Sequence, residues 1–298
     1  MTGVVHLVDA SYFIFRAYHS LPADMVDGDG QATHAVYGFA RFICDVLERV
    51  RPTHLAIAFD HRLETAPSFR QAIFPGYKAN REAPPADLKR QVGLCREFCR
   101  HLGLAEFASE RYEADDLIGT LAARTRAQGF VNVVLTRDKD LAQVIRAGDL
   151  FWDYTGGARY RYEDIGARFG AAPELMADFL ALTGDAVDNI PGVPGVGPKT
   201  ARLLCASFGP LDDLYARLAG VAALDIRGAV RLAARLEAHR EAAFLARRLT
   251  GIVCDLGLEA TAEDLRPRAP DRQALGEFFD TCRFGAILRQ QARRLAAA

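Results

Sequence analysis

The sequence of 298 residues lacks any run of eighteen apolar residues, the length that a membrane-spanning helix needs. Its first residues, MTGVVHLVDASYF, have no basic region ahead of an apolar run and a small-residue cleavage site, so they do not resemble a secretion signal. Internal repeats and low-complexity tracts are also missing, and half of the residues are hydrophobic. We therefore expect a globular cytoplasmic protein with one large domain or two modest ones.

The cysteines lack the C-x-x-C spacing of many structural zinc sites. The one close pair, Cys95 and Cys99, is spaced CREFC, and most of the six lie inside apolar or helical patterns. Buried, reduced thiols are the better interpretation. The six are Cys44, Cys95, Cys99, Cys205, Cys254 and Cys282.

A basic excess is missing as well, because the net charge is −1, and this argues against a general nucleic-acid binder. Nine carboxylates, however, fall into a few compact clusters, and setting them aside changes the balance from −1 to +8. A concentrated acidic site inside a basic exterior is typical of a metal-dependent nuclease, whose exterior must attract phosphate. Ordinary solvated charge is the alternative explanation.

Three short apolar runs each end in aspartate, which predicts buried strands. They are Val4–Asp9, His54–Asp60 and Asn132–Asp140. Segments with helical spacing lie at 37–50, 86–102 and 114–128. This order predicts an α/β fold with a parallel-dominated sheet flanked by helices, in which ligands bind at the carboxyl ends of the strands. We expect Asp9, Asp60, Asp138 and Asp140 to gather at that edge.

The composition and the residue pattern of the chain change along its length and divide it into three parts. We expect a nuclease-like core at 1–172 that includes an arch at about 61–100, and a second subdomain of short helices and glycine-proline turns at 173–265. A tail with a helix-like stretch follows at 266–298 and carries several arginines.

The acidic clusters fit two-metal hydrolysis of a phosphodiester, which needs several carboxylates around cations about 4 Å apart. Hard oxygen ligands suit Mg²⁺ or Mn²⁺. Each cluster also has a plain explanation as helix-capping or turn residues, and only their joint presence favours a metal site. The candidates are Asp9, Asp60, Glu113, Asp115, Asp116, Asp138, Asp140, Asp185 and Asp188.

Within YEADDL, the spacing constrains the backbone. Glu113 and Asp116 could share a helix face, whereas Glu113 and Asp115 would point apart on an ideal helix. Glu113 is therefore predicted to precede the first regular turn.

The segment Pro191–Ala201, PGVPGVGPKTA, predicts a tight turn leading into a helix whose free N–H groups can bind phosphate. Gly195 and Gly197 allow close approach of a DNA backbone, Pro198 suits an early helical position, and Lys199 supplies charge. The Walker A spacing is not met, because proline stands between glycine and lysine. We interpret the segment as a helix-hairpin-helix; an ordinary turn between two helices is the alternative.

Between Asp60 and Glu113 lies a long segment rich in proline and basic residues, with eight Lys and Arg against four Asp and Glu over 61–100. Tyr77, Lys78 and Arg81 place an aromatic ring beside two cations, a combination that can stack a displaced base and grip its phosphates. A solvated loop with its aromatic residues in the core is the alternative.

Taken together, LVDASYFIFRAYHSLP, AVYGF, AFD, SFR, GYKANR, YEADD, TRDKDL and LTGDAVDNIPGVPGVGPKTA resemble the signatures of the 5′ nuclease or flap endonuclease family. That family includes the amino-terminal domain of bacterial DNA polymerase I. The resemblance covers about residues 4–256 and implies a PIN-like sheet with a helical arch and a helix-hairpin-helix, or helix-3-turn-helix, subdomain.

The resemblance also implies roles for individual residues. One metal group would surround Asp9, Asp60, Glu113, Asp115 and Asp116, and a second would surround Asp138, Asp140, Asp185 and Asp188, with two Mg²⁺ that Mn²⁺ can replace. The arch cations Lys78 and Arg81 would steer the scissile phosphate, with Tyr77 beside the bound strand. The hairpin, with Gly192, Gly195, Gly197, Lys199 and Thr200, would grip duplex DNA, with K⁺ at its carbonyls.

The expected activity is 5′-3′ exonuclease or flap endonuclease cleavage that leaves a 5′-phosphate and a 3′-hydroxyl. Its substrates would be 5′ flaps, branched or 5′-ended duplexes and RNA primers. The resemblance further implies a monomer that associates with the bacterial nucleoid and does not bind membranes. The chain shows no polymerase or proofreading segment, so a free-standing form is expected, and it keeps both Asp185 and Asp188, which some free-standing relatives lack.

Three other functions fit parts of the sequence. A nuclease-inactive module that binds branched DNA is disfavoured by the intact acids, and a PIN-type ribonuclease by the arch and hairpin. A phosphohydrolase with Asp9 as nucleophile would need a second aspartate two positions on, where Ser11 stands.

Overall fold

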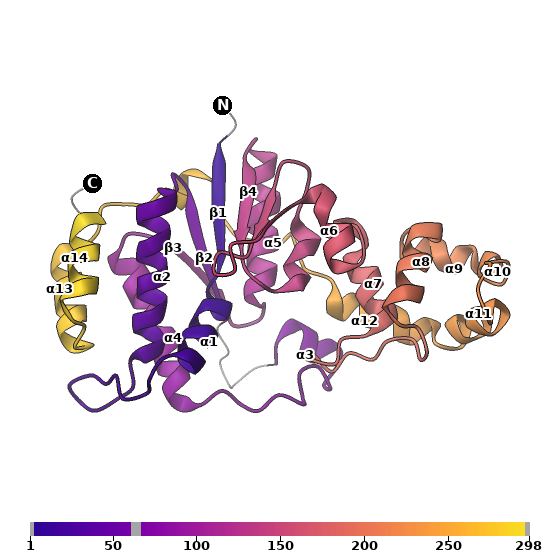
Figure 1. The fold of residues 1–298 in the computed structure, drawn as a ribbon, viewed down its shortest axis with the longest axis horizontal. Coiled ribbons are helices and arrows are strands. Elements are labelled where there is room, and N and C mark those ends of the chain that lie inside the picture. The colour runs from indigo at the N-terminus through magenta and orange to yellow at the C-terminus, as the bar shows by residue number, and fades with distance from the viewer. Residues whose placement is uncertain (1–2, 61–66, 296–298) are drawn as a thin grey trace.

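The computed structural model describes residues 3–60 and 67–295 and centres on one mixed sheet (Figure 1). The strand order is β3-β2-β1-β4-β5-β6, with β1 and β4 in the middle; all neighbouring pairs are parallel except β5 with β6. The strands are β1 (Val4–Asp9), β2 (Leu55–Asp60), β3 (Ala105–Ser109), β4 (Val131–Leu135), β5 (Leu150–Trp152) and β6 (Arg159–Arg161).

The predicted parallel sheet is confirmed, and so are the strands that end in Asp9 and Asp60. The third predicted strand was too long, because β4 ends at Leu135 and the chain then turns. Sequence periodicity missed β3, β5 and β6, since β3 is only half-buried and the other two have three residues each. Such short strands are held by their neighbours rather than by their own pattern.

Helices cover both faces of the sheet and extend the molecule to one side (Figure 1). They are α1 (Ala10–Ser20), α2 (His34–Val50), α3 (Phe69–Ile73), α4 (Ala86–His101), α5 (Ala114–Ala127), α6 (Tyr162–Phe169), α7 (Met176–Thr183), α8 (Pro198–Phe208), α9 (Leu211–Ala216), α10 (Leu218–Val221), α11 (Ala229–Ala238), α12 (Arg240–Thr250), α13 (Arg272–Thr281) and α14 (Ala286–Leu295). Short 3₁₀ turns are η1 (Lys139–Val144), η2 (Pro173–Leu175) and η3 (Glu263–Leu265).

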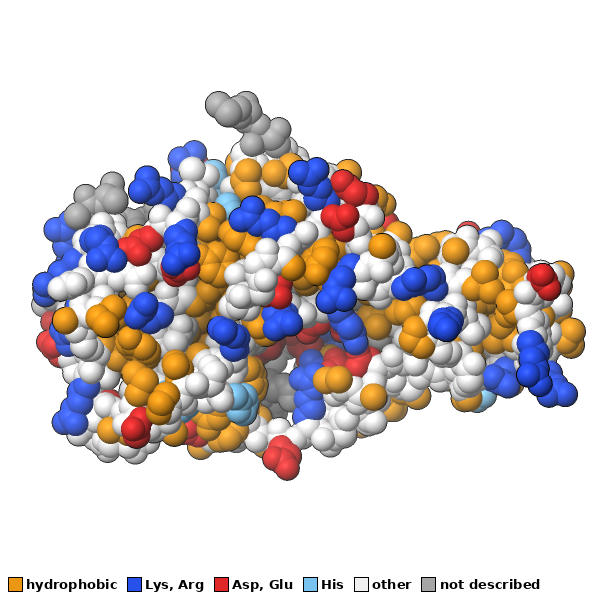
Figure 2. All heavy atoms as spheres, in the orientation of Figure 1, with side chains coloured by type: hydrophobic (Ala, Val, Ile, Leu, Met, Phe, Trp, Pro, Cys, Tyr) orange, Lys and Arg blue, Asp and Glu red, His pale blue; other side chains and the backbone are white. Residues whose placement is uncertain are grey.

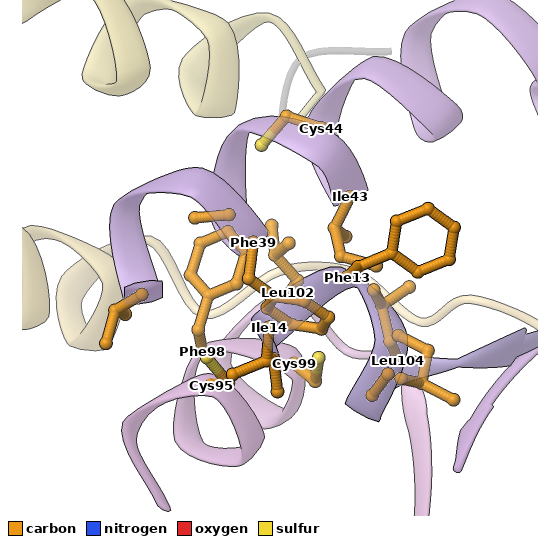
Figure 3. Packing of buried hydrophobic residues seen from close by; sticks show 14 of the residues in the cluster. Phe13, Ile14, Phe39, Ile43, Cys44, Cys95, Phe98, Cys99, Leu102 and Leu104 are labelled. Carbon is orange, nitrogen blue, oxygen red and sulfur yellow. The ribbon is translucent and has the colours of Figure 1, made fainter. Parts of the chain in front are cut away.

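The face of the sheet that α1, α2 and α4 cover holds the largest apolar cluster, part of which Figure 3 shows. Phe39 and Ile43 of α2 meet Phe98 of α4 and Phe13 of α1 there, all of them buried. On the opposite face, α5 packs on β1 and β4 through a second cluster. Burial of these large side chains supplies the main driving force for the core, at about 25 cal/mol per Å² of apolar surface.

The thiols lie largely as expected. Five cysteines are buried and unpaired, and only Cys254 is exposed. Burial raises the pKa of Cys44 to about 12 and holds the pKa of Cys95 well above its ordinary value. These thiols are therefore protonated, inert parts of the core.

The arch predicted at about 61–100 needs a correction. Its last part, 86–100, belongs to α4, which packs into the core through Leu88, Cys95 and Phe98. The described part of the arch is 67–85, which contains the single short helix α3, and residues 61–66 of the prediction lie outside the described residues. The apolar side of α4 explains the difference, because a helix with a buried stripe is held by the core.

The helices α7 to α12 form a lobe with its own apolar cluster, and α8 to α11 lie at the end of the molecule farthest from α13 and α14 (Figure 1). The chain then returns along the sheet domain. The predicted C-terminal tail is a pair of helices, α13 and α14, that pack against α4 and α2. No helix among residues 3–60 and 67–295 is both long and apolar enough to cross a lipid bilayer.

Candidate active site

Four elements bring acidic side chains to one edge of the sheet. Asp9 and Asp60 are the last residues of the parallel pair β1 and β2, and Asp138 follows the neighbouring strand β4. The start of α5 adds Glu113 and Asp115. Figure 2 shows acidic side chains in a hollow near the centre of one face, with Lys and Arg around it. The architecture thus gathers carboxylates that are far apart in sequence.

Asp9 is the most buried of these acids. Its Oδ2 accepts a hydrogen bond from the Thr136 hydroxyl at 2.8 Å, and its Oδ1 accepts one from the Tyr12 N–H at 3.3 Å, which caps α1. Burial and the charge of Asp60 raise the pKa of Asp9 to about 7. The side chain is therefore fixed in place but poorly compensated as an anion.

Glu113 occupies the N-cap of α5, which confirms the prediction that it precedes the first regular turn. Its Oε2 accepts hydrogen bonds from the Lys78 ammonium at 2.8 Å and the Tyr77 hydroxyl at 2.9 Å. Asp60 reaches the same helix end, where its Oδ1 accepts a bond from the Ala114 N–H at 2.8 Å. Burial and the charge of Asp138 raise the pKa of Asp115 well above its ordinary value.

The turn after β4 carries the next two acids. Asp138 caps η1 through a bond from the Asp140 N–H to its Oδ1, and Thr136 Oγ1 accepts a bond from the Asp138 N–H. Burial raises the pKa of Asp138, and burial with the charge of Asp138 raises the pKa of Asp140 to about 7. The Oδ1 atom of Asp140 is buried and makes no hydrogen bond.

Asp185 and Asp188 lie in the loop after α7. Asp185 is buried and accepts a bond from the Lys139 ammonium at 2.6 Å and one from the Val187 N–H at 2.8 Å. Burial alone would raise the pKa of Asp185, but Lys139 and the backbone donors lower it overall. Asp188 pairs with Arg81 and accepts a bond from the Tyr77 hydroxyl at 3.0 Å.

The arch cations reach the acids. The Lys78 side chain is 12% exposed and also lies 3.7 Å from the Asp188 carboxylate. Its backbone has a φ of 55°, in the left-handed region, and its N–H donates to the Asp188 carbonyl at 2.9 Å. Asn80 and Arg81 bond the carbonyls of the same loop. The arch is therefore docked on residues 186–188.

The prediction that Tyr77 offers its ring to a displaced base is wrong. The residue is 2% exposed, and its hydroxyl joins Glu113 to Asp188. The ring packs with Ile190 and Leu249, and the Lys78 ammonium lies 4.9 Å from its centre. The alternative interpretation, an arch aromatic in the core, applies here because the phenol spans from apolar packing to the acids.

Asp116 also differs from expectation. It is 0% exposed, and its two oxygens accept hydrogen bonds from the Arg70 guanidinium at 2.7 and 2.8 Å. Burial disfavours the charged form of Arg70, but Asp116 raises the pKa of Arg70 overall. Periodicity could not separate Asp115, which faces the other acids, from its neighbour, which turns inward at the next position of the helix.

The remaining acids suit divalent cations. Burial with mutual repulsion raises the pKa values of Asp9, Asp115, Asp138 and Asp140, and a cation would relieve that repulsion. Within the described ranges, no three Asp, Glu, His or Cys side chains already converge as metal ligands. Lys78, Lys139 and Arg81 instead neutralise part of the cluster, so side chains must shift when an ion binds.

The glycine-rich turn lies apart from the acids. Gly197 is the N-cap of α8 with Pro198 in its first turn, as predicted, and no side chain caps the helix. A Cβ on Gly197 would meet nothing within 4 Å, and Gly195 has a φ of 76°. Lys199 is exposed and Thr200 half-buried. The helix end is thus open, as a phosphate site requires.

Gly192 has a different role from the other glycines of the turn. A Cβ there would lie 2.3 Å from the Thr183 carbonyl carbon and 2.4 Å from the Gly184 nitrogen. The absence of a side chain at Gly192 therefore allows the turn to pack against the end of α7.

Sequence reasoning missed three residues of the site: Thr136, Lys139 and Arg70. Thr136 holds Asp9 and the Asp138 backbone, and Lys139 holds Asp185. A signal was present, because all three lie inside the segments TRDKD and SFR that carry the resemblance. Their roles depend on contacts across the fold, which a local motif does not reveal.

Comparisons with known proteins agree with this arrangement. A family model described as 5′-3′ exonuclease, N-terminal resolvase-like domain, matches residues 4–170, and one described as 5′-3′ exonuclease, C-terminal SAM fold, matches 171–273. DNA polymerase I of Pseudomonas aeruginosa is 42% identical over 270 residues, 90% of this chain and 29% of that protein. DNA polymerase I of Bacillus caldotenax is 35% identical over 286 residues, 95% of this chain and 32% of that protein. The chain thus spans about a third of the length of these relatives.

Solved structures share the fold. The T5 5′-exonuclease with bound zinc matches with a TM-score of 0.67 at 17% identity, over 99% of this chain and 98% of that one. The catalytic core of Rad2 with DNA substrate matches with a TM-score of 0.64 at 16% identity, over 99% of this chain and 91% of that one. With two family models that together cover residues 4–273, this chain belongs to the 5′-3′ exonuclease family.

Proposed function

We propose that the chain is a metal-dependent 5′-3′ exonuclease and 5′-flap endonuclease that hydrolyses DNA near junctions of single and double strands. The observation that carries the proposal is the group of eight carboxylates at one sheet edge, where burial and mutual repulsion raise several pKa values. Family membership supports the reaction class. The names of fold neighbours point to the substrates: a T5 flap endonuclease complex with DNA and metal ions, Rad2 with DNA substrate, and human GEN1 with Holliday junction DNA.

Two divalent cations fit the acids, with Mg²⁺ as the natural ion and Mn²⁺ as a substitute. Asp9, Asp60, Glu113 and Asp115 would hold one, and a second set would hold the other. The second set is Asp138, Asp140, Asp185 and Asp188. The cations would activate water and neutralise charge on the leaving oxygen. Asp116 is no longer a candidate ligand, because its oxygens are taken up by Arg70 and backbone donors.

In the reaction, a water oxygen forms a bond to phosphorus, and the bond to the 3′-oxygen breaks. The products are a 5′-phosphate and a 3′-hydroxyl. Lys78 and Arg81 now pair with Glu113 and Asp188, and the phosphate would take over these cations and have its developing charge stabilised. Lys78 and Arg81 are therefore the catalytic residues of the proposal beside the metal ligands.

Duplex DNA would bind at the open end of α8, with Gly195, Gly197, Lys199 and Thr200 close to its backbone. The proposal includes K⁺ at carbonyls of residues 192–200, and its test is whether duplex affinity rises with K⁺ at constant ionic strength. Branched DNA and RNA primers are the proposed substrates, acted on by a monomer.

The test is cleavage of a 5′-flap duplex labelled at each end, with Mg²⁺, with excess chelator, and with an Asp138→Ala/Asp140→Ala variant. Metal-dependent release near the junction that the variant loses is expected. Cleavage that persists in excess chelator or in the variant would contradict the proposal. Tight binding of intact flap by both proteins would favour a nuclease-inactive module that recognises branched DNA.

A further inference from the structure

The five residues that follow one another from Leu249 to Val253 connect the helical lobe to the sheet domain. They begin in the last turn of α12 and run past its end. Side chains from three other elements bind backbone groups of all five residues, through the carbonyls of 249, 250 and 251 and the N–H groups of 252 and 253. We call this segment the bracket. Two of these elements, α5 and η1, also carry acids of the site.

Arg70 of α3 holds the bracket from the arch side. The residue is 3% exposed, and its Nε donates to the Leu249 carbonyl and its Nη2 to the Gly251 carbonyl, both at 2.8 Å. Two further N–H groups of the guanidinium donate to the two oxygens of Asp116. Arginine alone offers this planar fork of donors, so the position cannot be filled equally well by lysine.

Asp116 of α5 holds the bracket from the side of the first acid group. Its Oδ1 accepts from Arg70 and from the Val253 N–H at 2.9 Å, and its Oδ2 accepts from Arg70 and from the Glu113 N–H at 3.2 Å. A carboxylate has about four acceptor positions, so all of them are in use. The last of these bonds fixes the backbone of Glu113 at the site.

Gln143 of η1 holds the bracket from the side of the second acid group. Its Nε2 donates to the Thr250 carbonyl at 2.9 Å, and its Oε1 accepts from the Ile252 N–H at 3.3 Å. The side chain is buried, and η1 also carries Asp140. Two adjacent bracket residues, Ile252 and Val253, are thus bound by anchors that belong to different acid groups.

We propose that the bracket sets the spacing between the two acid groups, and that Arg70, Asp116 and Gln143 are positioning residues for the nuclease reaction. This proposal rests on the proposed function. The groups that hold metal ligands in register typically affect activity ten- to a hundredfold when removed. Because α12 packs on α7 and belongs to the helical lobe, the bracket also fixes the lobe against the acids.

The experiment compares Arg70→Met, Asp116→Asn and Gln143→Leu with the unchanged chain in flap cleavage, with Mn²⁺ affinity measured directly. We expect each variant to lose about ten- to a hundredfold in kcat with KM for the flap nearly constant. The Arg70→Met/Asp116→Asn double variant should lose no more than the worse single variant, because the two residues act as one unit. Additive losses, or weaker Mn²⁺ binding in Asp116→Asn alone, would make Asp116 a metal ligand and overturn the proposal.

A matched control is Asp149→Asn. Asp149 is also buried, pairs with Arg126 and accepts bonds from backbone N–H groups, but it lies just before β5, beside the end of α5 that is far from the acids. The Asp149→Asn substitution should lower the unfolding temperature and leave kcat unchanged at temperatures where the protein is folded. An equal loss of kcat in this variant would show general destabilisation, and the positioning role would fail.

Hydrogen exchange gives a measurement that does not depend on activity. The N–H groups of Ile252 and Val253 should be protected in the unchanged chain, and that of Ile252 should exchange faster in Gln143→Leu. Unprotected amides in the unchanged chain would overturn the bracket. Protected amides in a chain that cleaves no flap would overturn the proposed function while the bracket stands.

Discussion

The acidic edge of the sheet and the glycine-rich turn before α8 are built in opposite ways for the ligands proposed for them, which are divalent cations at the edge and a phosphate at the turn. At the edge, buried carboxylates are fixed by Thr136, Lys78 and Lys139, and burial raises the pKa of Asp9 and of Asp140 to about 7. At the turn, Gly197 faces open space and no side chain caps the helix. At the edge, like-charged carboxylates repel one another until a cation binds. At the turn, the backbone N–H groups at the start of α8 are free to bind a phosphate.

This difference separates chemistry from binding. The charged groups of the edge are held beside the proposed position of the reacting phosphate, and stabilising charge that develops in the transition state is where electrostatic catalysis gains most. An open helix end bonds any DNA backbone and adds little to the rate. Changes at the edge should therefore alter kcat, and changes at the turn should alter affinity.

The largest effect should come from Lys78→Ala. Its ammonium lies among Glu113, Asp188 and the proposed phosphate position, so the cleavage rate should fall about 10²- to 10³-fold. Duplex affinity, measured by fluorescence anisotropy in chelator, should change little. A variant that instead cleaves normally at saturating DNA would move Lys78 from the chemistry to binding.

The next largest effect should come from Gly192→Ala, which tests whether the glycine-rich turn depends on close packing against the end of α7. The added Cβ would overlap the backbone of Thr183 and Gly184, and such overpacking costs typically about 1–3 kcal/mol. A melting temperature lower by several degrees is expected. Gly197→Ala is the control, because its Cβ meets nothing within 4 Å, and equal melting temperatures for both variants would contradict the assignment.

The acidic edge should make stability depend on pH when no metal is added. Asp9 and Asp140 have folded pKa values of about 7 against an ordinary 3.8, so the folded state holds more protons than the unfolded state between these values. Stability from these groups is present at low pH and is lost as the pH rises through about 7. Mg²⁺ should therefore raise the melting temperature by several degrees more at pH 8 than at pH 5.5. An Asp9→Asn/Asp140→Asn variant should lose that difference.

The smallest effect should come from Lys199→Ala at the turn. One phosphate contact would be lost, so duplex affinity should fall a few-fold, and the slope of log affinity against log salt should decrease by about 1. Cleavage at saturating DNA should stay constant. A fall in kcat without a change in the salt slope would erase the distinction between the two regions.

Much of the acidic edge could be predicted from sequence, because strands that end in aspartate leave a local pattern. Asp9, Asp60, Asp138 and Asp140 reach one edge as that pattern predicts. The positions that failed, Tyr77 and Asp116, point inward, and nothing within their own segments distinguishes an inward from an outward side chain there. Whether such a side chain binds a ligand or packs inside the protein depends on its partners elsewhere in the chain.

Local patterns predict the parallel sheet of the main strands, a place for Glu113 before the first turn of its helix, and an early helical position for Pro198, because apolar periodicity and capping act between neighbours in the chain. The meeting of Arg70, Asp116 and Gln143 at residues 249–253 depends instead on tertiary packing. Their hydrogen bonds join segments more than a hundred residues apart. Such contacts form only when packing has brought those segments together, so no local pattern encodes them.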